Sequence, residues 1–379
     1  MRRYLLFLLP ACAVALAAVI LLPASSGARR ATSSAQARPA VSSGLIVGLS
    51  EGGAGWGGES TGPRLDALMT TDAKWYRDAF WWYLIEPRPG RFSFAYYDHY
   101  MLLAAERGLH IVAQLVGTPS WAGATSTTLP AHPAVFARFV AALVHRYGTG
   151  GTFWRAHPTL APYAITAWEL WNEPYFSSGN GGVWNPGLYA RLVKAASTAG
   201  HALDPSAKFL IEAEMEAYHT SVWTWWVDAL YQAMPNFSRY FQGVAVHDFG
   251  TAVKTLYPIV SGQPYPNFGH IRRIEDLRRQ FVRHGAADKP FWIMESGWST
   301  CTQKSIDCVT PARQAADLRT MWGYLHTTWR SWVQALFVYR YQDGEPPNSV
   351  QGDYGLVELN GTPKPAFRIF KSYAAQSAN

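Results

Sequence analysis

The stretch AAERGLHIVAQL, residues 104–115, joins a helical pattern to a strand pattern within a few residues. Its first half contains the helix formers Ala, Glu and Arg and ends at Gly108, the residue type that most often follows a helix C-terminus. Its second half, HIVAQL, is a short apolar run of the kind that forms a buried strand. The stretch therefore predicts a helix that ends at Gly108 and leads directly into a strand.

The same succession of apolar run, loop and helical pattern recurs along the chain. Eight runs predict strands: LIVGL (45–49), WYRDAF (75–80), HIVAQL (110–115), AITAWEL (164–170), KFLIEA (208–213), GVAVH (243–247), FWIME (291–295) and ALFVYR (335–340). The predicted helices cover residues 63–69, 98–107, 133–147, 187–202, 221–234, 271–284, 311–328 and 365–373. Short apolar strands that alternate with helices pair in parallel, so eight such units predict an α/β fold, the (β/α)8 or TIM barrel.

An open, doubly wound sheet is the alternative fold. Such a sheet commonly carries a glycine-rich phosphate-binding turn after an early strand. The segment SEGGAGWGGES (50–60) is rich in glycine, but it has no GxGxxG pattern that leads into a helix. We therefore expect this segment to be a loop at the active site of a barrel.

The N-terminus has the features of an export signal. Residues 1–28, MRRYLLFLLPACAVALAAVILLPASSGA, place two arginines before a long apolar run and then small residues, which is the order of a signal peptide. The run 5–22 is 18 residues long, close to the shortest span that crosses a bilayer, so an uncleaved membrane anchor is the alternative. Residues 29–44, rich in Ala, Ser and Arg, predict a disordered linker, and residues 45–379 are the predicted catalytic domain. We expect the protein to be secreted, with membrane contact only through an uncleaved N-terminal segment.

Cysteines and charge narrow the class of protein further. Cys12 lies in the signal, and Cys301 and Cys308, seven positions apart in a polar loop, predict a local disulfide in an exported protein. The formal net charge of +7 is modest for this length and forms no dense basic stripe, so nucleic-acid binding is not indicated. His247 and Asp248 have no HExxH motif or acidic triplet beside them, and we expect neither a metal nor another cofactor.

Aromatic residues are unusually numerous. The chain has 17 Trp and 20 Tyr, many of them beside Gly, Pro and Asn in segments that form loops. Flat rings with a polar handle suit a ligand with apolar faces and polar edges. Sugars fit that description, so the composition favours a carbohydrate ligand.

Polar residues gather where the predicted strands end. In a (β/α)8 barrel these ends meet at one rim, and catalytic groups lie there. The polar residues at this rim are Glu51, Arg77, Asp78, Gln114, Asn172, Glu173, Glu212, Glu214, His247, Asp248, Glu295 and residues 339–342. Stability alone does not require so many polar residues at one rim, so their position indicates a functional site.

Two of these glutamates can share one cleft. Glu173 follows the fourth predicted strand, within WELWNEPYF (168–176), and Glu295 closes the seventh. Strands four and seven face each other across the barrel mouth. Glycoside hydrolysis requires two carboxyl groups at the bond, one to protonate the leaving oxygen and one to attack the sugar or to activate water. Structural ion pairing of both glutamates is the alternative.

Here the chain resembles the retaining glycoside hydrolases of clan A, a large group of (β/α)8 enzymes that includes families 5 and 39. The motifs that carry the resemblance are WNEP after strand four, IMESGW at strand seven, and the stretch 81–121, which begins WWYLIEP and ends GTPSW. The resemblance covers essentially all of residues 45–375. It implies a retaining hydrolase that cleaves β-glycosidic bonds in oligo- or polysaccharides by double displacement, and the signal-like N-terminus adds the expectation of export.

The resemblance implies a role for each matching residue. Glu173 is expected to be the acid/base, Glu295 the nucleophile, and Asn172 the partner of the sugar 2-hydroxyl. Arg77 matches the arginine that keeps the nucleophile ionised, since a nearby guanidinium favours a charged carboxylate. We expect Glu173, in an apolar stretch, to be poorly solvated and to keep its proton more readily. Glu169 has the same strand parity but lies deeper, so we expect it to pair with Arg77 rather than to react.

Other clan positions are matched less closely. His247 matches a histidine that lines the sugar cleft, with a structural histidine as the alternative. Phe249 stands where a tyrosine usually bonds the nucleophile, and Tyr257, Tyr265 or Tyr339 could replace it. Tyr339 or Tyr341 takes the place of a tryptophan platform after strand eight. The residues expected to contact sugar by stacking or lining are Trp121, Tyr175, Trp298 and Tyr339, with Trp56, Phe176 and Trp184 as further candidates.

A carbohydrate-binding barrel without catalysis is the alternative function. The presence of both Glu173 and Glu295 argues against it, because loss of either is the usual mark of such proteins. The sequence leaves open the sugar and its linkage, the choice between endo and exo action, and the oligomeric state.

Overall fold

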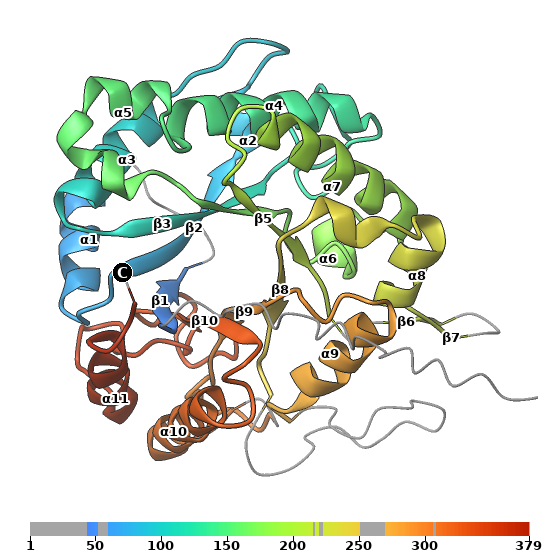
Figure 1. The fold of residues 1–379 in the computed structure, drawn as a ribbon. Coiled ribbons are helices and arrows are strands. Elements are labelled where there is room, and N and C mark those ends of the chain that lie inside the picture. Colours follow the sequence, from blue (N-terminus) through green and yellow to red (C-terminus); the bar gives the residue numbers. More distant parts are fainter. Residues whose placement is uncertain are drawn as a thin grey trace, which may run out of the picture. The chain divides into compact units, whose positions relative to one another are not determined.

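Eight parallel strands close into a barrel in the order β1-β10-β9-β8-β5-β4-β3-β2 (Figure 1). In this computed structural model the described residues are 44–51, 60–214, 217–219, 223–250, 270–305 and 308–378. The barrel strands are β1 (Ile46–Ser50), β2 (Trp75–Trp81), β3 (His110–Val116), β4 (Ala167–Leu170), β5 (Lys208–Glu212), β8 (Gly243–His247), β9 (Phe291–Ser296) and β10 (Val333–Tyr339). Each overlaps one of the eight predicted runs, so the predicted TIM barrel is confirmed.

Helices surround the barrel (Figure 1). They are α1 (Thr61–Met69), α2 (Trp82–Ile85), α3 (Ala95–Glu106), α4 (Pro133–Tyr147), α5 (Thr152–Ala156), α6 (Ser177–Asn180), α7 (Pro186–His201), α8 (Trp226–Ala233), α9 (Arg273–Arg283), α10 (Pro311–His326) and α11 (Pro365–Ala374). Four of them, α4, α7, α10 and α11, begin with proline, whose fixed φ suits the first helical position. Gly108 follows α3 with φ 75°, as the opening stretch predicted.

One predicted helix is shorter than expected. The sequence pattern placed a helix over residues 221–234, but α8 begins at Trp226 because Trp223–Trp225 forms strand β7. This strand pairs antiparallel with β6 (Ala217–His219) outside the barrel. Trp and Thr are favoured in strands, and the local hairpin overrides the helical pattern at this end. Residues 220–222 lie outside the described part of the chain.

Side chains fill the barrel interior in two layers. The lower layer, toward the strand N-termini, is apolar and consists of Trp75, Val112, Ala167, Leu210, Ala245, Trp292, Met294, Ala335 and Phe337. The upper layer lies two residues further along five of these strands and consists of Arg77, Gln114, Glu169, Glu212 and His247. Residues i and i+2 of a strand face the same side of a sheet, so both layers point inward. The barrel therefore changes from apolar to ionisable within two residues.

Strand β9 departs from this alternation. Val246 pairs with Ile293, whereas the next residue of β8, His247, pairs with Glu295. The pairing with β10 shifts in the same place. The extra residue is Met294, which belongs to the lower apolar layer. This bulge turns Glu295 inward as well, although strict alternation would have directed it outward.

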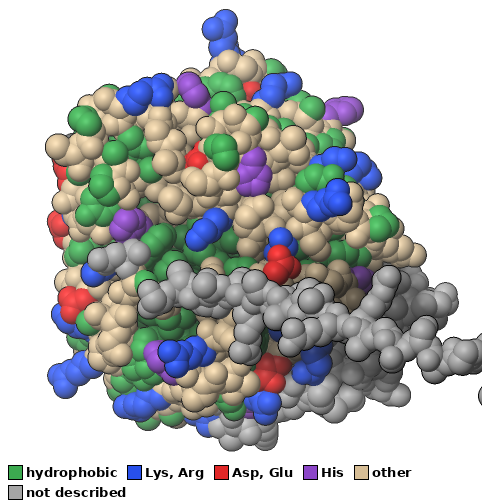
Figure 2. All heavy atoms as spheres, viewed as in Figure 1, with side chains coloured by type: hydrophobic (Ala, Val, Ile, Leu, Met, Phe, Trp, Pro, Cys, Tyr) green, Lys and Arg blue, Asp and Glu red, His purple; other side chains and the backbone are tan. Residues whose placement is uncertain are grey.

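The larger apolar core lies between the strands and the surrounding helices. Outward-facing residues of the strands, such as Trp168, Phe209 and Ile211, are fully buried there. Among the described residues, none of the helices has both the length and the apolar content required to cross a bilayer. On the face viewed in Figure 2, Lys and Arg side chains are spread over the surface among uncharged groups. The predicted signal segment and linker, residues 1–28 and 29–43, fall outside the described residues.

Candidate active site

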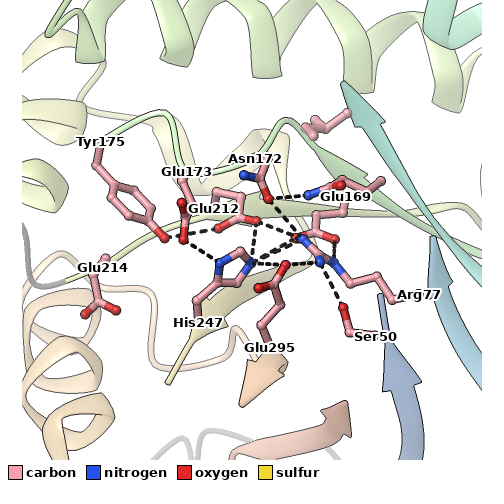
Figure 3. A network of polar contacts seen from close by, with 12 residues as sticks. Ser50, Arg77, Glu169, Asn172, Glu173, Tyr175, Glu212, Glu214, His247 and Glu295 are labelled. Carbon is pink, nitrogen blue, oxygen red and sulfur yellow. Dashed lines mark hydrogen bonds and ion pairs between the residues drawn. The ribbon is translucent and has the colours of Figure 1, made fainter. Parts of the chain in front are cut away.

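Arg77 lies at the centre of the upper layer. Its side chain is 1% exposed, and its guanidinium contacts side chains from several strands (Figure 3). Nε and Nη2 donate to the two carboxylate oxygens of Glu169, at 2.5 Å and 2.9 Å. Nη1 donates to Ser50 Oγ at 3.0 Å and to Glu295 Oε1. A buried, fork-shaped cation of this kind fixes the positions of the carboxylates around it.

Glu169 has the supporting position that the sequence predicted. It is fully buried and forms the two-pronged pair with Arg77. Burial raises the pKa of Glu169 to about 8, with the nearby carboxylate of Glu212 adding to the rise and Arg77 opposing it. The predicted pairing of Glu169 with Arg77 is confirmed.

Asn172 and Glu173 lie on a strained turn at the end of β4. Trp171 has φ 86° and Glu173 has φ 44°, both in the left-handed region that side-chain-bearing residues rarely adopt. Gly179 packs against this turn so closely that a Cβ there would lie 2.1 Å from the Glu173 carbonyl oxygen. Trp171 Nε1 donates to the Gly179 carbonyl at 2.6 Å and holds the turn to the following segment. The strain and the close packing together aim two adjacent polar side chains into the site.

Asn172 is oriented through one of its amide atoms. Gln114 Nε2 donates to Asn172 Oδ1 at 2.5 Å, and Arg77 Nη2 lies 3.4 Å from the same oxygen. Because both donors engage Oδ1, the Nδ2 group is directed away from them. The position of Gln114 at the end of β3 was visible in the sequence, but its contact with Asn172 was not predicted.

One imidazole ring links the two candidate catalytic carboxylates. His247 Nδ1 lies 2.8 Å from Glu173 Oε1, and His247 Nε2 lies 3.7 Å from Glu295 Oε1 (Figure 3). Glu173 comes from the turn after β4 and Glu295 from β9, so the two glutamates meet although they are 122 positions apart. The side chains of Glu173 and Glu295 are 23% and 12% exposed, in contrast to the fully buried Glu169.

The protonation of Glu173 differs from the sequence expectation. Burial by itself raises the pKa of Glu173, but the hydrogen bond and charge of His247 outweigh it, and the net pKa is lowered. Burial works against the charged form of His247, yet Glu212 and Glu295 hold the pKa of that imidazole well above its usual value. The expectation that Glu173 keeps its proton through poor solvation is therefore wrong, because it took no account of the histidine against its carboxylate.

Glu212 on β5 is a further member of the network. It is fully buried, and its Oε1 lies 3.2 Å from His247 Nε2 and 3.6 Å from Arg77 Nη2. Tyr175 donates its hydroxyl to Glu212 Oε2 at 3.4 Å. The sequence placed Glu212 at the rim without giving it a role. Its inward strand parity, two residues after Leu210, was the signal that could have assigned it to the network.

Three of these groups also have the spacing of metal ligands. Glu169, Glu212 and His247 offer ligand atoms that lie within 4.8 Å of one another. The guanidinium of Arg77 contacts all three, with Nη2 lying 3.2 Å from His247 Nε2. The cation that this cluster surrounds is therefore the arginine side chain.

A second ionic cluster supports the end of β8. Arg273, at the start of α9, pairs with Glu214 at 2.7 Å and with Asp248 at 3.1 Å, and it donates to the His247 carbonyl. Burial raises the pKa of Asp248 to about 7. This cluster joins the segments that follow β5 and β8 and holds the backbone of His247.

The network opens on one side into a small cavity. The cavity has a volume of about 160 Å³ and is partly open to solvent. Its lining includes Trp81, Gln114, Trp171, Asn172, Glu295 and Tyr339. A carboxylate, an amide and aromatic rings thus converge on one space, the combination that suits a ligand with hydroxyl groups and an apolar face.

The remaining predicted contact residues have different environments. Tyr339 lines the cavity, and the Tyr339–Arg340 peptide bond is cis. Tyr175 and Trp298 are each 3% exposed, and Trp298 Nε1 donates to the Gly250 carbonyl at 2.8 Å. Trp121 is partly buried and donates to the Glu86 carbonyl at 3.0 Å. Three further candidates lie outside the described residues: Trp56, Tyr257 and Tyr265.

Two further sequence predictions concern Phe249 and the disulfide. The Phe249 ring lies 6.0 Å from the Tyr339 ring and 6.5 Å from His247. It packs among aromatic rings and has no polar atom to offer a carboxylate. Cys301 and Cys308 form the predicted disulfide, with their Cα atoms 5.1 Å apart.

Solved structures that resemble this chain include several glycosidases. No family model matches the sequence, and a comparison with curated proteins gave no match either. The chain is similar in structure to a family 39 glycoside hydrolase from the gut symbiont Bacteroides cellulosilyticus WH2, with 16% identity, a TM-score of 0.64, and coverage of 88% of this chain and 64% of that one. It is also similar to the exo-beta-1,4-mannosidase Op5Man5 from Opitutaceae bacterium strain TAV5, with 18% identity, a TM-score of 0.58, and coverage of 87% and 59%.

A family 39 enzyme from Xanthomonas axonopodis pv. citri gives a similar result, with 15% identity, a TM-score of 0.60, and coverage of 88% of this chain and 67% of that one. At these identities the likeness shows the fold alone. The chain spans less than two thirds of the length of the first two of these structures. The barrel is thus one that family 39 glycoside hydrolases share, as the sequence motifs predicted.

Proposed function

We propose that the protein is a retaining glycoside hydrolase that cleaves β-glycosidic bonds in oligo- or polysaccharides. The observation that carries this proposal is that two carboxylates, Glu173 from the turn after β4 and Glu295 from β9, lie beside one imidazole, and that Glu295 lines a cavity. Two carboxyl groups at one cleft are what glycoside hydrolysis requires. The shared fold with known glycosidases supports the same reaction class.

In the first step, Glu295 attacks the anomeric carbon. Arg77 Nη1 donates to Glu295 Oε1 and holds this carboxylate in place before the attack. The bond between the anomeric carbon and the glycosidic oxygen breaks, and that oxygen takes a proton from Glu173 as the aglycone leaves. The product is a glycosyl ester on Glu295, which no longer carries a negative charge.

In the second step, water replaces the ester. Glu173 accepts a proton from a water molecule, whose oxygen attacks the anomeric carbon from the side that the aglycone left. The ester bond breaks and Glu295 regains its charge. Two displacements at one carbon return the original anomeric configuration, so the proposal includes retention.

Substrate binding is assigned to the residues around the cavity. The Nδ2 group of Asn172 is the donor for a sugar hydroxyl, because Gln114 and Arg77 engage its other amide atom. Trp81 and Tyr339 supply apolar faces beside Glu295. The structures of the same fold include a mannosidase, a glucosidase and β-galactosidases, so the sugar is left to experiment.

We also propose that the enzyme acts outside the cytoplasm. The signal-like N-terminal segment and the Cys301–Cys308 disulfide support export, since structural disulfides persist in oxidising compartments.

A panel of 4-nitrophenyl β-glycosides of glucose, galactose, mannose and xylose, together with polysaccharides, tests this proposal. We expect release of nitrophenol from at least one glycoside, and proton NMR of the first product should show the β-anomer. An α-anomer would rule out retention. If the protein bound a polysaccharide but hydrolysed no glycoside or polysaccharide, the non-catalytic binding function would replace the proposal.

A further inference from the structure

Glu212 is a buried carboxylate that the proposed reaction does not use. It lies at the end of β5, outside the lining of the cavity, and is fully buried. Its side chain contacts His247, Arg77, Tyr175 and Glu169, and among the described residues it forms no hydrogen bond or ion pair with Glu173 or Glu295. A buried charge is costly to keep unless it is paired or used, so its position calls for an explanation.

The two nitrogens of His247 face different partners. Nδ1 lies 2.8 Å from Glu173 Oε1 and faces the acid/base. Nε2 lies 3.2 Å from Glu212 Oε1 and also 3.2 Å from Arg77 Nη2. When Nε2 carries a proton it faces an acceptor in Glu212, and when it carries none it faces a donor in Arg77. The ring is thus held in one place in either protonation state.

The charges around His247 favour the protonated ring. They come from every neighbouring element of the upper rim: Arg77 on β2, Glu169 on β4, Glu173 after β4, Glu212 on β5, Glu295 on β9, and Asp248 and Arg273 behind the backbone. Of the carboxylates near Nε2, Glu212 is nearest at 3.2 Å, followed by Glu295 at 3.7 Å and Glu169 at 3.9 Å. Glu212 is therefore the carboxylate nearest to that nitrogen.

We propose that Glu212 is a positioning residue for acid catalysis: it orients His247 and keeps a proton available between His247 Nδ1 and Glu173 Oε1. The inference rests on the proposed glycosidase function. A carboxylate that fixes one imidazole nitrogen so that the other serves a reacting group is a known arrangement in hydrolases. Here the reacting group on the far side is itself a carboxyl, so the proton is shared along the line Glu212, His247, Glu173.

The proton balance follows from this line. Before reaction the pair Glu173–His247 holds one transferable proton, located on His247 Nδ1 or on Glu173 Oε1. As the glycosidic bond breaks, that proton goes from Glu173 to the leaving oxygen, and the Glu173–His247 pair has lost one proton. In the second step the proton from the attacking water returns to Glu173 and restores the pair. No other reactant is required.

The arrangement also accounts for the lowered pKa of Glu173. An acid catalyst with a depressed pKa is a poor donor by itself at neutral pH. A neighbouring imidazolium can pass its Nδ1 proton to Glu173 over 2.8 Å and thereby supplies the proton that the ionised carboxylate lacks. The donor in the first step is then the pair rather than Glu173 alone.

Leaving-group dependence in a Glu212→Gln variant tests the proposal. Gln keeps the shape of the side chain and removes the charge beside Nε2. For aryl glycosides with poorly acidic phenols, which need protonation to leave, we expect kcat/KM to fall roughly 10- to 100-fold, the worth of a hydrogen bond to a charged group. For 2,4-dinitrophenyl glycosides, which leave without protonation, the loss should be much smaller. The alkaline limb of the pH profile of kcat/KM should move to lower pH, because the proton on the pair is held less firmly.

Glu169→Gln is the matched control. Glu169 is equally buried, contacts Arg77 and shares a hydrogen bond with Glu212. It lies farther from His247, at 3.9 Å from Nε2, and it bonds the guanidinium that faces Glu295. We expect Glu169→Gln to lower kcat/KM by the same factor for substrates with good and with poor leaving groups. If Glu212→Gln also lowered both alike, or left the alkaline limb in place, Glu212 would be a structural residue only and the inference would be wrong.

Tyr175→Phe provides a second test if Glu212→Gln does not fold. This change removes only the hydroxyl that donates to Glu212 Oε2. We expect a loss of about 2- to 10-fold, again confined to poor leaving groups, because this hydrogen bond is long and reaches His247 only through Glu212. An equal loss for good and poor leaving groups would overturn the inference. A wild-type protein that hydrolyses no glycoside would instead overturn the proposed function.

Discussion

The lower and upper layers of the barrel interior are built on the same strands and differ in chemistry. The lower layer is apolar on every strand that contributes to it, whereas the upper layer consists of buried ionisable and amide groups. The pairs of lower and upper residue on one strand are Trp75 and Arg77, Val112 and Gln114, Ala167 and Glu169, Leu210 and Glu212, and Ala245 and His247. One step of strand alternation therefore separates the part of the interior that holds the barrel together from the part that can react.

The contrast indicates how such a cluster is tolerated. Four carboxylates around one guanidinium and one imidazole are costly in a buried setting, because Glu169 and Glu212 lose all of their hydration and Glu173 and Glu295 lose most of theirs. The apolar layer beneath contributes burial that offsets part of that cost. If this division is right, changes in the upper layer should alter catalysis more than stability, and changes in the lower layer should do the reverse.

The largest effect is expected at the nucleophile. Glu295→Gln keeps the side-chain shape and the contact with Arg77 but cannot form the glycosyl ester. We expect kcat to fall by a factor on the order of 10⁵–10⁶, the cost of removing a hydrolase nucleophile. Steady-state hydrolysis of the best aryl glycoside measures it. The exposed Glu106→Gln on α3 is the control and should retain full activity; a Glu295→Gln variant within tenfold of the wild type would remove this residue from the reaction.

A smaller loss is expected at the acid/base. Glu173→Ala removes the proton donor of the first step and the base of the second, and we expect a loss of about 10²–10⁴-fold on substrates with poor leaving groups. Added azide, a small nucleophile that needs no base, should restore turnover on 2,4-dinitrophenyl glycosides and give a glycosyl azide of the β-configuration. Absence of any azide product, with intact folding by circular dichroism, would contradict the role of Glu173.

A substitution in the lower layer should lower the stability of the protein more than its activity. Leu210→Ala removes a fully buried side chain two residues before Glu212, and we expect the free energy of unfolding to fall by about 2–5 kcal/mol. Urea unfolding measures this change, and kcat/KM at a temperature where the variant is folded should stay within about threefold of the wild type. A large loss of activity in the folded variant would show that the two layers are not separable.

The smallest effect concerns pH. Asp78 follows Arg77 on β2 and is buried; burial raises its pKa from the ordinary 3.8 to about 8. Between these values the folded chain keeps a proton on Asp78 that the unfolded chain has lost. The contribution of Asp78 to stability is therefore fully present below about pH 4 and is lost as the pH rises toward 8. Glu169, with a pKa of about 8, and Asp248, with one of about 7, act in the same direction.

Asp78→Asn should therefore flatten the dependence of stability on pH by up to one proton. Asn resembles the protonated acid and does not titrate. Urea unfolding at about pH 5 and pH 8 gives the difference in the free energy of unfolding for the wild type and the variant. The difference should be smaller in the variant, and equal differences would show that Asp78 does not titrate in this range.

Most of the fold could be predicted from the sequence because the strands are short, apolar and regularly spaced. All eight predicted runs overlap barrel strands, and α4 has the bounds that its pattern predicted. The miss at residues 221–234 came from a local hairpin, whose pairing no helical pattern can reveal. Most strands and helices can be predicted from the residues within them. The β6–β7 hairpin depends instead on pairing between two segments, which the pattern of either segment alone does not reveal.

The site was predictable only in part. Strand-end position indicated Glu173, Glu295, Arg77 and Asn172, and the structure brings these four together. The inward turn of Glu295 depends on the bulge at Met294, which follows from pairing with β8 and β10 and has no sequence signal. The same limit applies to His247: its contact with Glu173 reverses the expected direction of the pKa of that carboxyl, and only a tertiary contact could show it.

Mass spectrometry after reaction with 2-deoxy-2-fluoro glycosides tests the central claim most directly. Fluorine at C2 slows both displacements, and an activated leaving group lets the first proceed, so a glycosyl ester accumulates on the nucleophile. With 2,4-dinitrophenyl 2-deoxy-2-fluoro-β-glycosides of the sugars that the enzyme accepts, we predict one added fluorosugar per chain, located on Glu295 by peptide sequencing. A label on another residue, or no label on an enzyme that turns over the parent glycoside, would contradict the account.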